Sequence, residues 1–174
     1  MPIELKYIYT LMSNTFWRNT KSSTDDWQTP IQYLKIIDLY IDKDTRINDP
    51  FWCSGLVKEK WKELGRDIIH EKTDFFTDDY TTTDIIVGNP PFSILVDVLV
   101  KLFEIDKPFA ILIPIGKIAQ MKVQKILRNY NIQLIVADCY VGFITADGKP
   151  SRCPTSYYVW LVYKFNLDRD LVFV

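Results

Sequence analysis

Hydrophobic positions along the chain follow two spacings in turn, one typical of strands and one typical of helices. Short apolar runs predict six strands, at residues 46–49, 67–70, 83–88, 108–114, 132–136 and 156–165. Apolar residues at helical spacing follow Pro30, Gly55 and Ser93, and a basic amphipathic segment covers residues 118–129. Strands that alternate with helices predict an α/β fold with a mainly parallel sheet.

The ends of these elements are set by residues that start or stop helices. Thr29 suits the N-cap of the first helix and Pro30 its first helical position, and Gly65 suits the C-terminal end of the second helix. No helix separates the last two strands, so we expect them to pair as an antiparallel hairpin at one edge of the sheet. We expect residues 1–25 to form an N-terminal arm and residues 26–174 to form one domain.

Composition narrows the class of protein. Hydrophobic residues make up 48% and charged residues 25% of the 174 residues, which excludes general disorder. The net charge of -1 excludes a uniformly basic nucleic-acid binder, and three cysteines with one histidine argue against a zinc site or a disulfide framework. We read no signal peptide and no membrane span, and therefore expect a cytoplasmic protein, or a nuclear one in a nucleated cell.

Two loops carry residues suited to chemistry, and each directly follows a strand. The first runs from Asp49 to Gly55 and opens a helix after a glycine, so its backbone N–H groups can approach a ligand. The second is Asn89-Pro90-Pro91-Phe92. Ligands of open α/β sheets bind at the carboxyl ends of the strands, so both loops are expected at one binding edge.

The second loop suits a planar group that bears NH2. Its two prolines remove two N–H donors and fix two φ angles, which holds the Asn89 amide and the Pro90 carbonyl rigidly. Phe92 adds a flat apolar face beside these acceptors. Alternatively, the second loop could be a stiff turn without a chemical role, and Asp49-Pro50 could be a simple turn after a strand.

The two loops together resemble the amino-methyltransferases that use S-adenosylmethionine, above all the phage-type and viral DNA N6-adenine methyltransferases. The resemblance covers about residues 26–174 and implies a class I methyltransferase (Rossmann-like) fold, truncated in the middle. It implies a catalytic loop of Asn89, Pro90, Pro91 and Phe92. It also implies cofactor contacts from Trp27, Thr29 and Pro30 at the methionine end, from Asp49, Phe51 and Gly55 in the first loop, from Glu71 at the ribose, and from Asp74 and Phe75 at the adenine.

By this resemblance, the adenine is flipped out of DNA, stacks on Phe92 and receives the methyl group directly, without a metal. The resemblance also allows RNA as the partner, a second subunit that supplies target recognition, and a phage- or virus-encoded protein. Two departures are Cys53, where the family has a glycine, and the short span between Gly65 and Asp84. These departures leave open a catalytically degenerate binding subunit, and related Asn-Pro-Pro motifs leave open an RNA or protein-glutamine methyltransferase.

The acidic stretch, His70 and a basic segment each allow both a functional and a structural interpretation. Glu71 and Asp74 lie in an acidic stretch that is as readily a solvated surface, and His70 is more often structural than catalytic. Residues 101–130 carry six basic and two acidic residues, which predicts either a phosphate-contacting patch or an ordinary solvated helix face.

Overall fold

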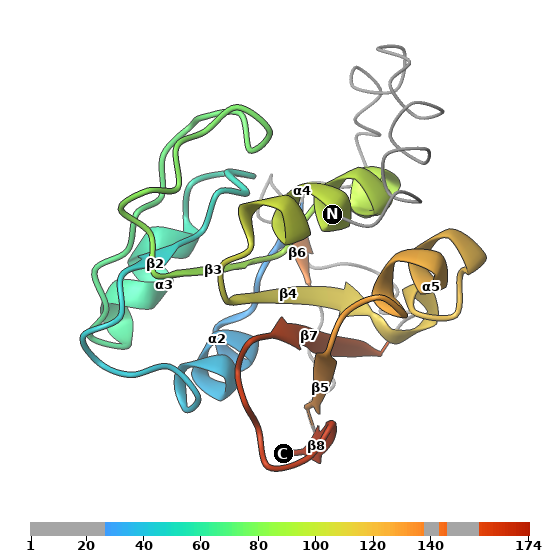
Figure 1. The fold of residues 1–174 in the computed structure, drawn as a ribbon. Helices are drawn as coiled ribbons and strands as arrows, with labels where there is room; N and C mark the ends of the chain where they lie inside the picture. The colour runs from blue at the N-terminus through green and yellow to red at the C-terminus, as the bar shows by residue number, and fades with distance from the viewer. Residues whose placement is uncertain (1–26, 138–142, 146–156) are drawn as a thin grey trace.

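The computed structural model describes residues 27–137, 143–145 and 157–174. The N-terminal arm expected at residues 1–25 lies outside the described residues, so that prediction stays a prediction. The described residues form a twisted sheet with helices on both faces (Figure 1).

Six strands form the main sheet in the order β2-β3-β4-β7-β5-β8, and a second sheet pairs β1 with β6. Five of the six strands run parallel, and β7 runs antiparallel between β4 and β5. The strands are β1 (Trp27–Gln28), β2 (Ile47–Asn48), β3 (Ile85–Gly88), β4 (Phe109–Pro114), β5 (Ile132–Val136), β6 (Ile144–Thr145), β7 (Tyr158–Tyr163) and β8 (Leu171–Phe173). The α/β class with a mainly parallel sheet is therefore confirmed.

The structure corrects two details of the sheet. The last two long strands, β5 and β7, do pair antiparallel, but β7 lies inside the sheet and β8 forms the edge. The strand expected at residues 67–70 is reduced to one bridge between Asn48 and Ile69, which agrees with a fold shortened in its middle.

Four α-helices and two 3-10 turns connect the described strands. They are α2 (Ile31–Asp38), α3 (Val57–Glu63), η2 (Phe92–Ile94), α4 (Leu95–Ile105), η3 (Ile115–Lys117) and α5 (Met121–Leu127). Helix α2 begins one residue later than expected, with Pro30 rather than Thr29 at the N-cap, because the fixed φ of proline (-63°) leads the chain into the helix without a side-chain cap. Gly65, with φ of +76°, ends α3 as expected.

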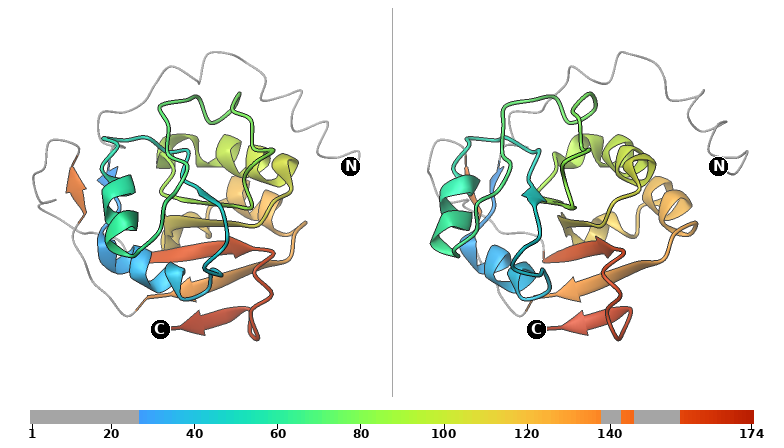
Figure 2. Two further views of the ribbon diagram at one scale, coloured as in Figure 1. Left: turned by 90° about the vertical axis from the view of Figure 1, so that its left-hand side faces the viewer. Right: turned by 60° about the vertical axis from the view of Figure 1, so that its left-hand side comes forward.

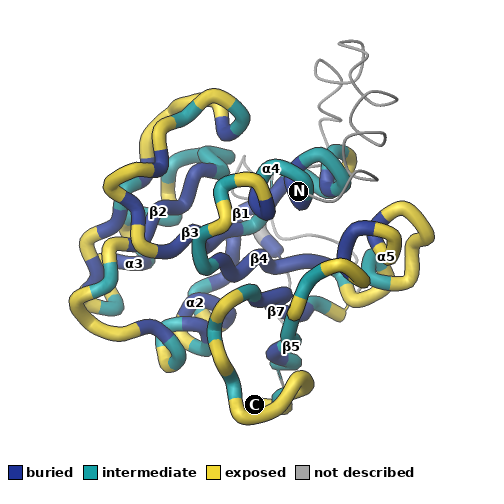
Figure 3. Tube along the Cα trace, viewed as in Figure 1, coloured by how far each residue is buried: buried dark blue, intermediate teal, exposed yellow. Residues whose placement is uncertain are grey.

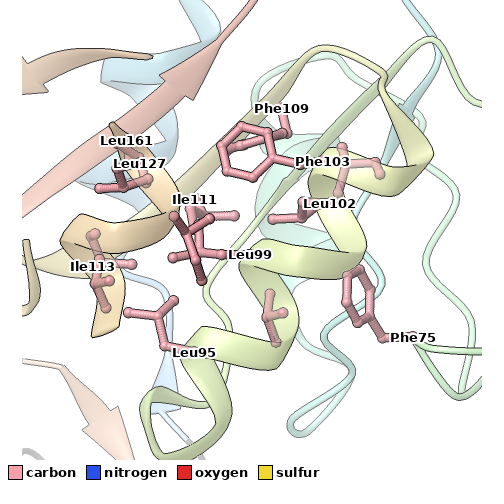
Figure 4. Close-up of a cluster of buried hydrophobic side chains, with 14 of the residues drawn as sticks. Phe75, Leu95, Leu99, Leu102, Phe103, Phe109, Ile111, Ile113, Leu127 and Leu161 are labelled. Carbon is pink, nitrogen blue, oxygen red and sulfur yellow. The ribbon is translucent and has the colours of Figure 1, made fainter. Parts of the chain in front are cut away.

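The helices cover the two faces of the sheet in pairs (Figure 2). Helices α4 and α5 pack on the face that carries Phe109, Ile111 and Ile113 of β4, and Figure 4 shows this cluster around α4. Helices α2 and α3 pack on the opposite face, against Ala110 and Leu112. Strand β4 is buried on both faces, which explains its continuous apolar run.

The parallel register of β2 and β3 brings the two chemical loops together. Ile47 lies beside Ile85 and Asn48 beside Ile86, so the loops that follow both strands leave the same edge of the sheet. At the opposite ends of these strands, the Arg46 guanidinium and backbone N–H donate to the Asp84 carboxylate at 2.8–3.0 Å. This clamp fixes the register of the two strands whose other ends carry the candidate site.

Candidate functional site

A small pocket lies where β2 and β3 end. It is formed by β1 and the residue after it, the loop after β2, the start of α3 and the first residue after β3. The lining residues are Trp27, Gln28, Thr29, Asp49, Phe51, Trp52, Cys53, Ser54, Leu56, Val57 and Asn89. Both loops singled out from the sequence therefore contribute to one pocket.

Gly88 allows the two loops to approach each other. A Cβ atom at this position would lie 2.6 Å from Asp49 Oδ1 and 2.6 Å from a ring carbon of Phe51. Atoms at that separation overlap, so only glycine fits between the end of β3 and the loop after β2. Sequence reasoning missed Gly88, although its place directly before Asn89 was a usable signal.

Asp49 is an acidic residue held away from water. The residue is only 2% exposed, its Oδ1 accepts a hydrogen bond from the Phe51 N–H at 3.1 Å, and its own N–H donates to the Ile69 carbonyl at 3.0 Å. Burial raises the pKa of Asp49 to about 8, against the smaller opposing effect of the Phe51 hydrogen bond. Asp49 is thus a proton-carrying group at neutral pH, and a nearby cation would favour its ionised form.

The side-chain oxygen of Asn89 is a hydrogen-bond acceptor that no donor among the described residues reaches. The Nδ2 of Asn89 donates to the Trp27 carbonyl at 3.1 Å, which fixes the orientation of the amide because a carbonyl can only accept. Its Oδ1 is buried and has no hydrogen-bond partner among the described residues. A buried unpaired acceptor typically costs about 1–3 kcal/mol, so this atom marks a place where a ligand donor would be stabilised.

The loop over residues 52–55 closes the pocket with side chains. Gly55 has φ of +77°, its N–H donates to the Trp52 carbonyl at 2.7 Å, and a Cβ atom there would lie 2.7 Å from the Trp52 ring. Cys53 also has a positive φ, of 44°, which glycine adopts more readily than other residues. The enclosed space is about 10 Å³, which is room for about one water molecule.

His70 supports this loop from behind. Its Nδ1 donates to the Asp49 carbonyl at 2.7 Å, and its ring stacks on Trp52 with 4.8 Å between centroids. Burial is the main cause of the lowered pKa of His70, so the neutral ring is favoured. The side chain holds both Asp49 and Trp52 in place, in agreement with a structural histidine.

Phe92 of the second loop belongs to a row of four aromatic rings. Its ring centroid lies 6.0 Å from that of Tyr158, and Tyr158 lies 4.3 Å from Phe143, which stacks on Tyr33 at 5.9 Å. Phe92 itself is half-buried, and Lys117 donates to its carbonyl at 3.2 Å. Tyr33 and Phe143 belong to the buried core, so the row anchors Phe92 to the body of the fold.

The structure brings some of the predicted site residues together and leaves others apart. Trp27, Thr29, Asp49, Phe51 and Asn89 all line the pocket. The other predicted residues do not line it. Pro30, Gly55 and Pro90 are adjacent in sequence to lining residues, Pro91 and Phe92 follow Asn89 within three residues, and Phe75 packs on Phe51 with 5.0 Å between centroids.

Glu71 and Asp74 lie outside the lining, on an exposed loop that projects from the body of the fold (Figure 3). Their cofactor role stays a prediction. A further residue that the sequence did not reveal is Lys60 of α3, whose Nζ donates to the Thr29 carbonyl at 2.6 Å and fixes the segment before α2.

The part of the chain that the structure describes has neither a cluster of metal-ligating side chains nor a membrane-spanning helix. No group of three or more His, Cys, Asp and Glu side chains there is placed to hold a metal ion. None of the helices described in the structure combines the length and apolarity needed to cross a bilayer.

Comparison with known proteins gave no matching family model and no curated protein of similar sequence. Among solved structures, a TehB-like SAM-dependent methyltransferase from Corynebacterium glutamicum matches 94% of this chain and 98% of its own, with 13% identity and a TM-score of 0.38. A modification subunit of a putative type I restriction enzyme from Vibrio vulnificus matches 91% of this chain and 46% of its own, with 11% identity and a TM-score of 0.45. At these identities and TM-scores we assign the chain to no family.

Proposed function

We propose that this chain is an S-adenosylmethionine-dependent methyltransferase that modifies a planar exocyclic amine, with N6 of adenine in DNA as the substrate. The Asn89 amide carries the proposal. Its Nδ2 is engaged by the Trp27 carbonyl, and its Oδ1 is buried without a partner in the described part of the chain. An amine substrate supplies the donor that this oxygen lacks.

The residues after Asn89 suit the same substrate. The Pro90 carbonyl is a second acceptor beside the amide, and neither Pro90 nor Pro91 has an N–H that would compete for the amine. The half-buried Phe92 ring offers a face on which a flipped base can stack. Two acceptors on one NH2 group orient its lone pair toward the methyl donor, which is catalysis by positioning and aimed dipoles.

The other side of the pocket suits the cofactor. Bound S-adenosylmethionine would supply an electrophilic methyl group on a sulfonium centre. Thr29, Asp49 and Phe51 would hold it, and the Asp49 carboxyl suits a cation because a neighbouring positive charge offsets the burial that raises its pKa. The pocket volume is about 10 Å³, so the cofactor would need more room than the pocket offers, which a movement of Trp52 and its loop would provide.

The first test is calorimetric titration of the protein with S-adenosylmethionine, followed by transfer of a labelled methyl group to DNA, RNA and protein. We expect binding, and label on adenine in DNA. Label on RNA or on protein glutamine would show that the substrate is not DNA. Cofactor binding without methyl transfer would favour a non-catalytic subunit. Absence of cofactor binding would refute the proposal.

The second test removes the Asn89 amide, on which the proposal rests. We expect Asn89→Ala to lower the rate of methyl transfer by about 10²–10³-fold, as loss of an aimed hydrogen-bonding group does, and to leave cofactor affinity within a few fold. Asn131→Ala is the matched control, because Asn131 is exposed and follows α5. If the Asn89→Ala variant kept its activity, Asn89 would have no role in the reaction.

A further inference from the structure

On the basis of the proposed function, we infer that the segment over residues 115–128 is the surface that docks the phosphate backbone of DNA. This segment contains η3 and α5, and its cations are Lys117, Lys122, Lys125 and Arg128, which we call the basic strip. The inference goes beyond the reaction itself, because it identifies where the polymer that carries the target amine is held.

The charge of the segment is unusual for this chain. Residues 107–137 contain no Asp or Glu, while the chain as a whole has a net charge of -1. Lys122, Lys125 and Arg128 are exposed, and no residue of the basic strip forms an ion pair within the described residues. Unpaired cations concentrated on one surface create a positive potential that attracts a polyanion.

Helix α5 orients these cations outward. Lys122, Lys125 and Arg128 follow one another at intervals of three residues, so they fall on neighbouring positions of the helix surface. Val123, Ile126 and Leu127 occupy the opposite face and are buried against α4 and the sheet. The buried face fixes the rotation of the helix and therefore the direction in which the basic strip points.

The basic strip is in contact with the substrate loop. Lys117 Nζ donates to the Phe92 carbonyl at 3.2 Å, directly after the proline pair. The Ile115 N–H donates to the Tyr157 carbonyl at 2.9 Å, and the next residue, Tyr158, packs near Phe92 with 6.0 Å between centroids. A strand of nucleic acid that follows the cations therefore reaches the place where Phe92 and Asn89 would receive a base.

Exposed apolar side chains accompany the cations. Ile115 is 45% exposed, Met121 69% and Tyr157 72%. Proteins that extract a base or open a base step place apolar side chains beside cations, because these side chains replace the lost stacking. An acidic protein partner would match the charge but would not require this position next to the substrate loop, so the nucleic acid is the favoured occupant.

The test is duplex DNA binding by the full chain, measured as fluorescence anisotropy over a range of salt concentrations. The strip variant carries Lys122→Glu, Lys125→Glu and Arg128→Glu. The matched control carries Lys35→Glu, Lys72→Glu and Arg169→Glu, which changes the net charge equally at three exposed positions elsewhere. We expect the strip variant to lose at least about tenfold in affinity, with a salt dependence reduced by about one unit of slope per lost contact, while the control keeps most of its affinity.

Equal losses in the two variants, unchanged binding by the strip variant, or no DNA binding by the wild type would each overturn the inference. Binding to an acidic protein or to anionic vesicles through the same residues, without DNA binding, would also overturn it. Titration with S-adenosylmethionine separates this result from the proposed function. A protein that binds cofactor but not DNA loses the docking surface and the DNA substrate but remains a methyltransferase, whereas one that binds DNA through the strip but no cofactor keeps the docking surface and loses the methyltransferase assignment.

Discussion

Acidic side chains in this protein occur in two contrasting settings. Asp49 is buried in the pocket and burial raises its pKa, whereas the acids of the loop over residues 71–84, which we call the acidic loop, are mostly exposed (Figure 3). Asp74 and Asp79 accept hydrogen bonds from backbone N–H groups two residues further on, and Asp84 binds Arg46. The contrast teaches that burial, rather than the number of neighbouring acids, is what raises the pKa of a carboxyl group in this protein.

The largest expected effect is on the pH dependence of stability. Asp49 has a folded-state pKa of about 8, above its usual value near 4, so the folded protein binds a proton that the unfolded chain has released between these values. This stabilising contribution is complete below about pH 4 and is lost as the pH rises through about 8. Relative to Asp49→Asn, the wild type should lose about 1.4 kcal/mol per pH unit, and up to about 4 kcal/mol between about pH 5 and pH 8.

Urea denaturation of both proteins at several pH values measures this difference and cancels the titration of other groups, His70 included. The acidic loop has the opposite sign, because hydrogen bonds from Thr81 lower the pKa of Asp79 and those from Arg46 lower that of Asp84. Their contribution is present above the unfolded pKa and is lost as the pH falls. If the difference in the free energy of unfolding between the wild type and Asp49→Asn did not change with pH, the buried Asp49 would not differ from the exposed acids in the way proposed.

The next effect is steric. Gly88→Ala places a methyl group 2.6 Å from both Asp49 Oδ1 and Phe51, so we expect a loss of about 1–3 kcal/mol in the free energy of unfolding together with weaker cofactor binding. Gly116→Ala is the control, since a Cβ atom there meets nothing within 4 Å. Thermal denaturation and calorimetric titration measure both quantities. Equal behaviour of the two alanine variants would show that the loops do not need their close approach.

A smaller effect is expected in the loop over residues 52–55. Cys53 adopts φ of 44°, so Cys53→Gly relieves the strain of a side chain in the left-handed region, and we expect a gain of up to about 1 kcal/mol in the free energy of unfolding. Chemical denaturation measures it. The larger entropy of glycine in the unfolded chain limits the gain, and a clear loss of stability would indicate that the cysteine side chain contributes packing to the pocket.

The smallest effect is expected in the acidic loop. Asp74→Asn keeps a side-chain oxygen that can accept the Phe76 N–H, and the residue is exposed, so stability should change by less than about 0.5 kcal/mol. Calorimetric titration should show unchanged affinity for S-adenosylmethionine if Asp74 belongs to a solvated surface. A marked loss of affinity would instead support the adenine contact implied by the family resemblance.

The sequence predicted the fold well where one periodic signal dominated. The apolar run of β4 and the spacing of α4 are each decided by burial, which the pattern of side chains records directly. The edge strand β8 escaped prediction because Leu171 and Phe173 are exposed and short strands have little pattern of their own. The place of β7 inside the sheet was also missed, because strand order depends on contacts distant in sequence.

In the candidate site, the sequence singled out residues whose chemistry is local, and their functional roles stay a prediction. Asn89 and Asp49 stand out because prolines and strand ends surround them, and the structure brings both into one pocket. Gly88 and Lys60 were not predicted, since their roles depend on distances across the fold: a close approach between two loops, and a carbonyl 31 residues away in the chain. Sequence patterns report such distances only when the partner is already known.

The antiparallel strand β7 gives the folding reaction a late step. Residues 158–163 lie between β4 and β5, so these two strands have no shared neighbour until residues 158–163 have been synthesised. Until then the apolar edges of both strands stay open to wrong partners, because pairings of large sequence separation form slowly. Shortening the chain before Tyr158 should therefore produce aggregation rather than a smaller folded domain.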